Sequence, residues 1–376
     1  YGAGSHYSGS NYTVGGYDSP TGALCGYDLF FPADAPLLGD EHWVLDWPIR
    51  DDTDQREQLM FWFLEQYGLP NHYRRYVNLF VNGIQRGTIY DDVQQPDSNG
   101  LREWFPSDSQ GVLLKTDCWD EFLDSGDAVA GLNCVLNTLE RFVAPDGSKK
   151  TSRYRWNWRP RAAGGLATEY DDFFTLVDAV NYPTDRGFVE AVQSVVDVEH
   201  WMRTFAMNDL ASYWDGFGNV NAKNTYLYKP ARSGWKLISW DFDVGLGINF
   251  NDEPTRPLFG DVLDPELVRI YASPQLLRPY WVAMDEAVNS FFKAGPGTAV
   301  EAIINSKYAA FKTNRIALAE PSAIRDWMIQ RRAYITNQLR AVAAPFALTT
   351  PATQQSESPD GVVSLAGTAP ANLQSI

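Results

Sequence analysis

The sequence is poor in cysteine and histidine, with three Cys and four His among its 376 residues. These counts exclude a disulfide-rich scaffold, and the spacing of the cysteines does not fit a zinc site. For Cys118 and Cys134 two interpretations stay open, a disulfide bridge and buried free thiols. A bridge would indicate an oxidising compartment, because a reducing cytosol keeps thiols free.

Long apolar runs and a signal sequence are also missing. No stretch approaches the roughly 20 apolar residues that a membrane helix needs, so we expect no membrane insertion. The first ten residues, YGAGSHYSGS, lack the basic and apolar regions of a signal peptide. We expect either that a signal has been removed or that this sequence starts inside a longer protein.

Positive charge is scarce, since 31 Lys and Arg stand against 47 Asp and Glu, for a formal net charge of -16. Such a chain repels phosphates, so we expect no nucleic acid partner. Hydrophobic residues make up 44% of the chain and aromatic residues 14%, which is enough for a sizeable core. The length favours two lobes or two domains.

Strand patterns dominate the first half of the chain. Short strands and loops are expected over residues 1–40, and a helix of about a dozen residues is expected between Asp54, as N-cap, and Gly68. Asn82-Gly83 predicts a tight hairpin turn, and GVLLK, ending at Lys115, predicts another strand. Residues 144–170 have the composition of a polar connector.

Helical patterns dominate the second half. Asp197 is expected to cap a helix that runs past residue 205, and Ser322 is expected to begin a helix that ends before Pro345. We therefore predict an α+β, two-lobed domain over residues 1–345, with a strand-rich N-lobe over about 1–125 and a helix-rich C-lobe over about 126–345. Residues 346–360 are typical of a linker, and residues 361–376 resemble the start of a β-sandwich.

The stretch between Tyr213 and Asp243 carries the chemistry. Two aromatic strands around the turn KPARSG predict a hairpin, with Asn224 at its start and Asp241 and Asp243 at its end. Because a hairpin folds back on itself, these residues and Asp215 are expected to converge. Carboxylate and amide oxygens are ligands that Mg²⁺ prefers, and phosphoryl transfer needs such a set together with an Asp that positions the attacking hydroxyl.

Two other interpretations of these acids stay open. Asp and Asn at hairpin ends are common turn formers and caps. A pair of carboxylates about 5 to 9.5 Å apart would also suit a glycoside hydrolase.

Several separated motifs resemble the CotH kinase family, which is named for a bacterial spore-coat protein and is akin to atypical secretory-pathway kinases. Over roughly residues 27–250, the resemblance rests on Trp43-Val44-Leu45, Arg56, Gly68-Leu69-Pro70, Val81-Asn82-Gly83, Gly87, Tyr90, Asp215-Gly216, Lys223-Asn224, Tyr226-Leu227-Tyr228, Trp235-Lys236 and Trp240-Asp241-Phe242-Asp243. Their order along the chain is that of the family.

The resemblance implies a protein-kinase-like two-lobed fold that binds ATP with Mg²⁺ or Mn²⁺ and phosphorylates Ser or Thr of a protein partner. It implies that Asp215 and Asp241 are catalytic, and that Asp241, Asp243 and Asn224 face the metal, with Asn224 also near the cofactor. It also implies a secreted, extracellular or cell-surface protein of bacterial type, with a surface-assembly partner as the alternative to a substrate.

Two departures from the family favour a catalytically weak pseudokinase that acts as a structural or adhesion module. The family has a Glu where this chain has Gln94, and its early strand carries a Lys that residues 27–31 lack. Without that Lys the phosphates lose a neutralising charge. Lys115 is the substitute we assign to the cofactor, with Arg102, Arg153 and Arg155 as weaker candidates, and Gln94 takes the place of the Glu.

Overall fold

A computed structural model describes residues 3–8, 26–48, 50–122, 132–161, 169–248, 253–260, 262–350, 361 and 365–370. Within these residues the chain is α+β, with antiparallel sheets and ten helices. None of these helices combines the length and the apolar character needed to cross a membrane. The expected strands in residues 9–25 lie outside the described residues.

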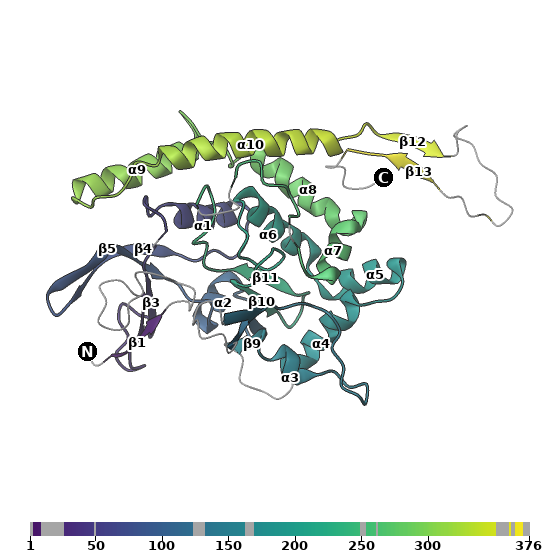
Figure 1. Cartoon of the computed structure of the whole chain (residues 1–376), viewed down its shortest axis with the longest axis horizontal. Helices are drawn as coiled ribbons and strands as arrows, with labels where there is room; N and C mark the ends of the chain where they lie inside the picture. The colour runs from purple at the N-terminus through teal and green to yellow at the C-terminus, as the bar shows by residue number, and fades with distance from the viewer. Residues whose placement is uncertain are drawn as a thin grey trace.

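The first sheet has five antiparallel strands in the order β1-β2-β3-β5-β4. Its strands are β1 (Gly4–Ser8), β2 (Gly26–Phe30), β3 (His42–Asp46), β4 (Arg74–Val81) and β5 (Ile84–Val93). Asn82 and Gly83 both have positive φ, 53° and 79°, which confirms the tight turn between β4 and β5. The hairpin extends from the body of the molecule (Figure 1).

Helix α1 (Arg56–Gln66) follows β3 and carries residues that matter for the site. The prediction that Asp54 caps it was wrong, because the carboxylate of Asp51 accepts the backbone N–H groups of Gln55 at 2.9 Å and Arg56 at 2.7 Å. Gly68, with φ 68°, follows the helix in the left-handed conformation that favours glycine. The helix therefore begins and ends within two residues of the expected bounds.

The second sheet has four antiparallel strands in the order β11-β10-β6-β9. Its strands are β6 (Val112–Thr116), β9 (Trp158–Arg161), β10 (Thr225–Lys229) and β11 (Lys236–Ser239). The structure confirms the hairpin of β10 and β11 and the strand that ends near Lys115. The expected polar connector over 144–170 instead holds β9, where Trp158 is buried and pairs with Thr116.

The remaining helices supply most of the large apolar core together with α1, and one of them, α6, packs against β11 of this sheet. They are α2 (Ser98–Trp104), α3 (Thr151–Tyr154), α4 (Glu169–Val180), α5 (Asp185–Val195), α6 (Val198–Leu210), α7 (Pro265–Ala272), α8 (Pro274–Asn289), α9 (Ala299–Thr313) and α10 (Ser322–Val342). The carboxylate of Asp197 accepts the N–H of His200 at 3.0 Å, so the predicted cap of α6 is confirmed.

The last helices run along one side of the molecule, and two short strands extend beyond it (Figure 1). These strands, β12 (Ala347–Thr350) and β13 (Ala366–Thr368), pair with each other and are exposed. The assignment of 346–360 as a linker and of 361–376 as the start of a β-sandwich stays a prediction.

A further hairpin pairs β7 (Trp119–Phe122) with β8 (Leu132–Val135). Cys118, just before β7, is disulfide-bonded, which excludes the alternative of a free thiol at this position. The side chain of the predicted partner, Cys134, lies outside the described residues.

Helix α1 also packs into the helical core, which generates a stability prediction. Phe63 is fully buried, and its ring lies 5.3 Å from that of Phe292 and 5.9 Å from that of Phe291. We expect Phe63→Ala to lower the free energy of unfolding by about 3–5 kcal/mol, measured by urea denaturation. The matched control is Phe80→Ala, at a residue that is 58% exposed, with an expected change within about 0.5 kcal/mol. Equal losses in the two variants would contradict this account of the core.

Candidate metal and phosphoryl-transfer site

The two ends of the β10–β11 hairpin lie side by side, as the sequence predicts. Thr225 pairs with Ser239, and just beyond them the N–H of Trp240 donates to the carbonyl of Asn224 at 2.9 Å. This bond places Asn224 next to the segment that carries Asp241 and Asp243.

Asp215 lies against the start of the same hairpin. Its carboxylate accepts hydrogen bonds from the side-chain amides of Asn224, at 2.9 Å, and Asn221. Burial raises the pKa of Asp215 to about 6. The charge of Lys223 and the hydrogen bond from Asn221 partly oppose this rise, and the negative charge of Asp241 adds to it. Asp215 is therefore a stronger base than an ordinary carboxylate and is still ionised at neutral pH.

A local turn after β11 brings both later acids to this side. Asp241 has φ 55°, in the left-handed region, so the alternation of a strand stops here. Burial raises the pKa of Asp243 well above its usual value, and Asp241 and Asp215 raise it further, because like charges lie nearby. Asp243 also forms an ion pair with Arg50. The sequence left open which acid faces the site, and the turn places both near Asp215.

Phe242, between the two acids, fixes this turn. Its backbone N–H donates to the carboxylate of Glu57 at 2.8 Å. The centre of its ring lies 5.1 Å from that of Phe61 and 4.8 Å from that of Tyr213. The hydroxyl of Tyr213 donates to the carbonyl of Asp241 at 2.8 Å. The backbone that carries Asp241 is thus held on both sides.

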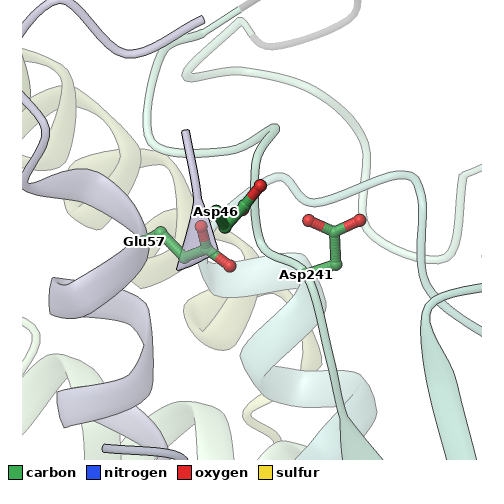
Figure 2. A group of neighbouring side chains, drawn as sticks. All are labelled: Asp46, Glu57 and Asp241. Carbon is green, nitrogen blue, oxygen red and sulfur yellow. The ribbon is translucent and has the colours of Figure 1, made fainter. Parts of the chain in front are cut away.

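Asp46, Glu57 and Asp241 form a candidate metal site (Figure 2). One carboxylate oxygen of each lies within 4.8 Å of the others. The three side chains come from the end of β3, the first turn of α1 and the turn after β11, and they point toward one another. Carboxylate oxygens in such a group suit a hard divalent cation.

Sequence reasoning found Asp241 and missed Asp46 and Glu57. Both residues belong to the strand-rich half of the chain, far in sequence from the stretch between Tyr213 and Asp243. One signal was present for Glu57: it is an acid within a helix whose other residues are largely apolar, REQLMFWFLEQ.

Arg74, at the start of β4, is the buried cation beside this carboxylate group. Its side chain is 2% exposed and forms ion pairs with Glu57, with Asp91 at 3.3 Å and with Asp46 at 4.0 Å. Burial raises the pKa of Glu57 well above its usual value; Arg74 lowers it and Asp241 raises it again. Burial and then Asp241 raise the pKa of Asp46 to about 6. More acids than cations therefore meet here.

Lys115 faces the same region from β6. It pairs with Tyr226 across the β6–β10 ladder, and its Nζ lies 6.0 Å from the centre of the Tyr226 ring. Burial lowers the pKa of Lys115, and Asp117 and Asp241 raise it. The structure thus places the ammonium within the electrostatic reach of Asp241.

Gln94 makes its contacts elsewhere. Its amide accepts the N–H of Tyr73, just before β4, at 3.1 Å and donates to Glu103 of α2 at 2.7 Å. The weaker basic candidates also have local partners: Arg102 with Asn99, Arg153 with Asn157, and Arg155 over the ring of Trp156. The structure does not bring these four side chains to the carboxylate group in any contact among the described residues.

Comparison with known proteins supports the motif assignment. A family model described as "CotH kinase protein" matches residues 27–291, which is more than half of the chain. A curated relative, "Invasin CotH2" of Rhizopus delemar, is 24% identical over 220 residues, covering 56% of this chain and 33% of the relative. The match therefore spans about a third of that protein's length.

The crowding of acids generates a prediction about Asp46. We expect Asp46→Asn to raise the melting temperature in the absence of metal by about 2–4 °C, because it removes an ionised carboxyl that burial and Asp241 destabilise at pH 8. The same variant should lose most of the stabilisation that Mn²⁺ gives the unchanged protein, measured by thermal shift.

Asp34→Asn is the control, since Asp34 is exposed in a loop outside the site. It should change neither the melting temperature nor the Mn²⁺ response. A full Mn²⁺ response in Asp46→Asn would exclude Asp46 as a ligand.

Proposed function

The chain belongs to the CotH kinase protein family, and from this premise we propose that it is an atypical, metal-dependent protein kinase. It transfers the terminal phosphoryl group of ATP to Ser or Thr of a secreted or surface protein. The observation that carries the proposal is the meeting of Asp46, Glu57 and Asp241 next to Asp215 and Asn224.

In this proposal the fold is two-lobed and kinase-like. The five-stranded sheet and α1 form the smaller lobe, and the four-stranded sheet with its helices forms the larger one. An ion pair between a Glu on α1 and a cation on the adjoining sheet supports this assignment, because a kinase pairs a strand Lys with a helix Glu. Here the Glu is Glu57, and its cation is Arg74 from the next strand, β4.

Asp46, Glu57 and Asp241 fit a divalent cation because they supply three oxygen ligands and excess negative charge in one place. Asp243, whose charge acts on this group, would be a further ligand, and the amide oxygen of Asn224 would be another. Mg²⁺ or Mn²⁺ would neutralise charge that develops on the transferred phosphoryl group. The protein's own task is to hold these carboxylates together, which Arg74 and the Glu57–Phe242 bond do.

Asp215 is the residue we assign to the incoming hydroxyl. The Asn221 and Asn224 amides orient its carboxylate, and its raised pKa, about 6, makes it a better proton acceptor than an ordinary Asp. It takes the proton of the Ser or Thr hydroxyl while that oxygen bonds to the terminal phosphorus and the bond from phosphorus to the ADP oxygen breaks.

Lys115 is the proposed phosphate-binding cation. Within the described residues no carboxylate lies within 4.0 Å of its Nζ, so its charge is available to an anionic ligand. Burial lowers the pKa of Lys115, and the carboxylates of Asp117 and Asp241 oppose this effect because they favour the charged ammonium. This residue supplies from β6 the positive charge that the early strand lacks.

A second candidate function is adhesion by a catalytically weak pseudokinase on the cell surface. The relative from Rhizopus delemar is an invasin, which favours this function, as do Gln94 and the missing strand Lys. Nucleotide binding with no phosphoryl transfer would support this function over the first.

The kinase proposal predicts that Asp241→Asn lowers phosphoryl transfer by at least about a hundredfold, because it removes one of the oxygen ligands and a charge from the site. The measurement is transfer of radioactive phosphate from ATP with Mn²⁺ to the protein itself and to Ser-rich substrates. Asp285→Asn, on the outer side of α8 and bonded to Asn289, should keep full activity. Transfer that persists in Asp241→Asn would refute the metal assignment.

A separate prediction concerns pH. Because Asp215 must be ionised to accept a proton and its pKa is about 6, kcat/KM should rise about tenfold per unit up to about pH 6 and level off above 7. Saturating Mn²⁺ is needed, since the pKa of Asp46 is also about 6. In Asp215→Asn the residual rate should lose this rise. An unchanged profile would assign the ionisation to another group.

A further inference from the structure

Two arginines of β9 share one face of the second sheet with Lys115. Arg159 pairs with Lys115 and Arg161 pairs with Leu113 in the antiparallel β6–β9 ladder. Directly opposite residues in such a ladder point to the same face. On the other side of β6, Tyr226 pairs with Lys115. Arg159, Lys115 and Tyr226 therefore form a row across three strands, with Arg161 beside it.

This row leads toward the carboxylate group. Burial raises the pKa of the Tyr226 hydroxyl. The positive charges of Arg161 and Arg159 lower this pKa, and the negative charges of Asp117 and Asp241 raise it. The same four charges act on Lys115. In the strand order β11-β10-β6-β9, Tyr226 on β10 and Lys115 on β6 lie between the arginines of β9 and the end of β11, after which Asp241 follows.

The positive charge of this face is only partly neutralised. Arg159 forms an ion pair with Asp117 at 2.9 Å, with about half of the arginine side chain exposed. Arg161 donates to the carbonyl of Pro160 at 3.2 Å, and no carboxylate of the described chain lies within 4.0 Å of its guanidinium. Lys115, Arg159 and Arg161 thus share this face with one paired acid, Asp117. Such an excess of positive charge is unusual in a chain of net charge -16.

We propose that Arg159 and Arg161 bind an acidic segment of the protein substrate and so select acidic sequences for phosphorylation. The proposal rests on the kinase function above and adds its substrate class. Guanidinium groups bind carboxylates in paired hydrogen bonds, and the surrounding negative charge of the protein would otherwise repel an acidic substrate.

The sheet order gives the expected spacing. β9 lies three strands from β11, so its side chains are about 14 Å away from that strand, since neighbouring strands are about 4.8 Å apart. An extended peptide covers this distance in about four residues. Acidic residues three to five positions from the phosphorylated Ser or Thr should therefore reach the arginines.

The experiment compares four peptides with one central Ser. One has Asp at positions three to five after the Ser, one has Asp at the corresponding positions before it, one has Asn at all of them, and one has phosphoserine in place of Asp. We expect one of the two Asp peptides to have a kcat/KM about tenfold above that of the Asn peptide, mainly through KM. The phosphoserine peptide distinguishes carboxylate from phosphate as the preferred anion.

The variant that tests the residues is Arg161→Glu, alone and with Arg159→Ala. It should remove the preference for the Asp peptide and leave the rate on the Asn peptide within about twofold, because the carboxylate group is untouched. The matched control is Arg186→Glu on α5, whose side chain is 92% exposed. Melting temperatures of all variants show whether the fold is kept.

Binding separates this inference from the kinase function. Fluorescence anisotropy of labelled Asp and Asn peptides, with Asp241→Asn protein and no ATP, should show at least tenfold tighter binding of the Asp peptide. This preference should be lost when Arg161→Glu is added.

If this binding holds and no peptide is phosphorylated, the kinase function fails and the acidic site stands. If peptides are phosphorylated with equal efficiency and Arg161→Glu has no effect, the kinase stands and the acidic site is refuted. A raised KM for ATP with every peptide would show that the arginines hold nucleotide, which also overturns the proposal.

Discussion

The candidate site depends on one buried guanidinium, that of Arg74. It joins acids from three other elements, Glu57 of α1, Asp91 of β5 and Asp46 of β3, and is almost inaccessible to water. A buried charge is tolerated only when it is paired, and here three acids share one cation. Asp241 then adds a carboxylate to a group that Arg74 alone cannot neutralise. This remaining negative charge is the physical reason why a divalent cation suits the site.

Packing of α1 and β4 against the later helices also fixes the position of Glu57. Phe63 of α1 packs on Phe291 and Phe292, which lie just past α8. Helix α9 adds a contact between Phe311 and Tyr76 of β4 at 4.8 Å and a hydrogen bond from Lys307 to Gln58. The last helices, which lie along one side of the molecule (Figure 1), therefore hold the helix and strand that carry Glu57 and Arg74. A site of crowded like charges needs such support, because the acids repel one another.

Patterns that act over a few residues predicted structure well. The Asn82-Gly83 turn, the cap of α6 by Asp197, the strand that ends near Lys115 and the aromatic hairpin were all expected. Errors arose where a distant contact overrides composition. The polar connector holds β9 because Trp158 and its neighbours pair with β6, and Asp51 caps α1 in place of Asp54 because the chain folds back before the helix.

By itself, the sequence determined the family, the α+β class and the convergence of Asp215, Asn224, Asp241 and Asp243, since these follow from ordered motifs and from one hairpin. Only the tertiary structure decided that Asp46 and Glu57 join Asp241, that Arg74 neutralises them and that Gln94 lies elsewhere. The bond from Phe242 to Glu57 spans 185 positions in the chain. No local propensity or periodicity encodes a contact of that range, because it depends on how α1 and the segment after β11 pack together in the tertiary structure.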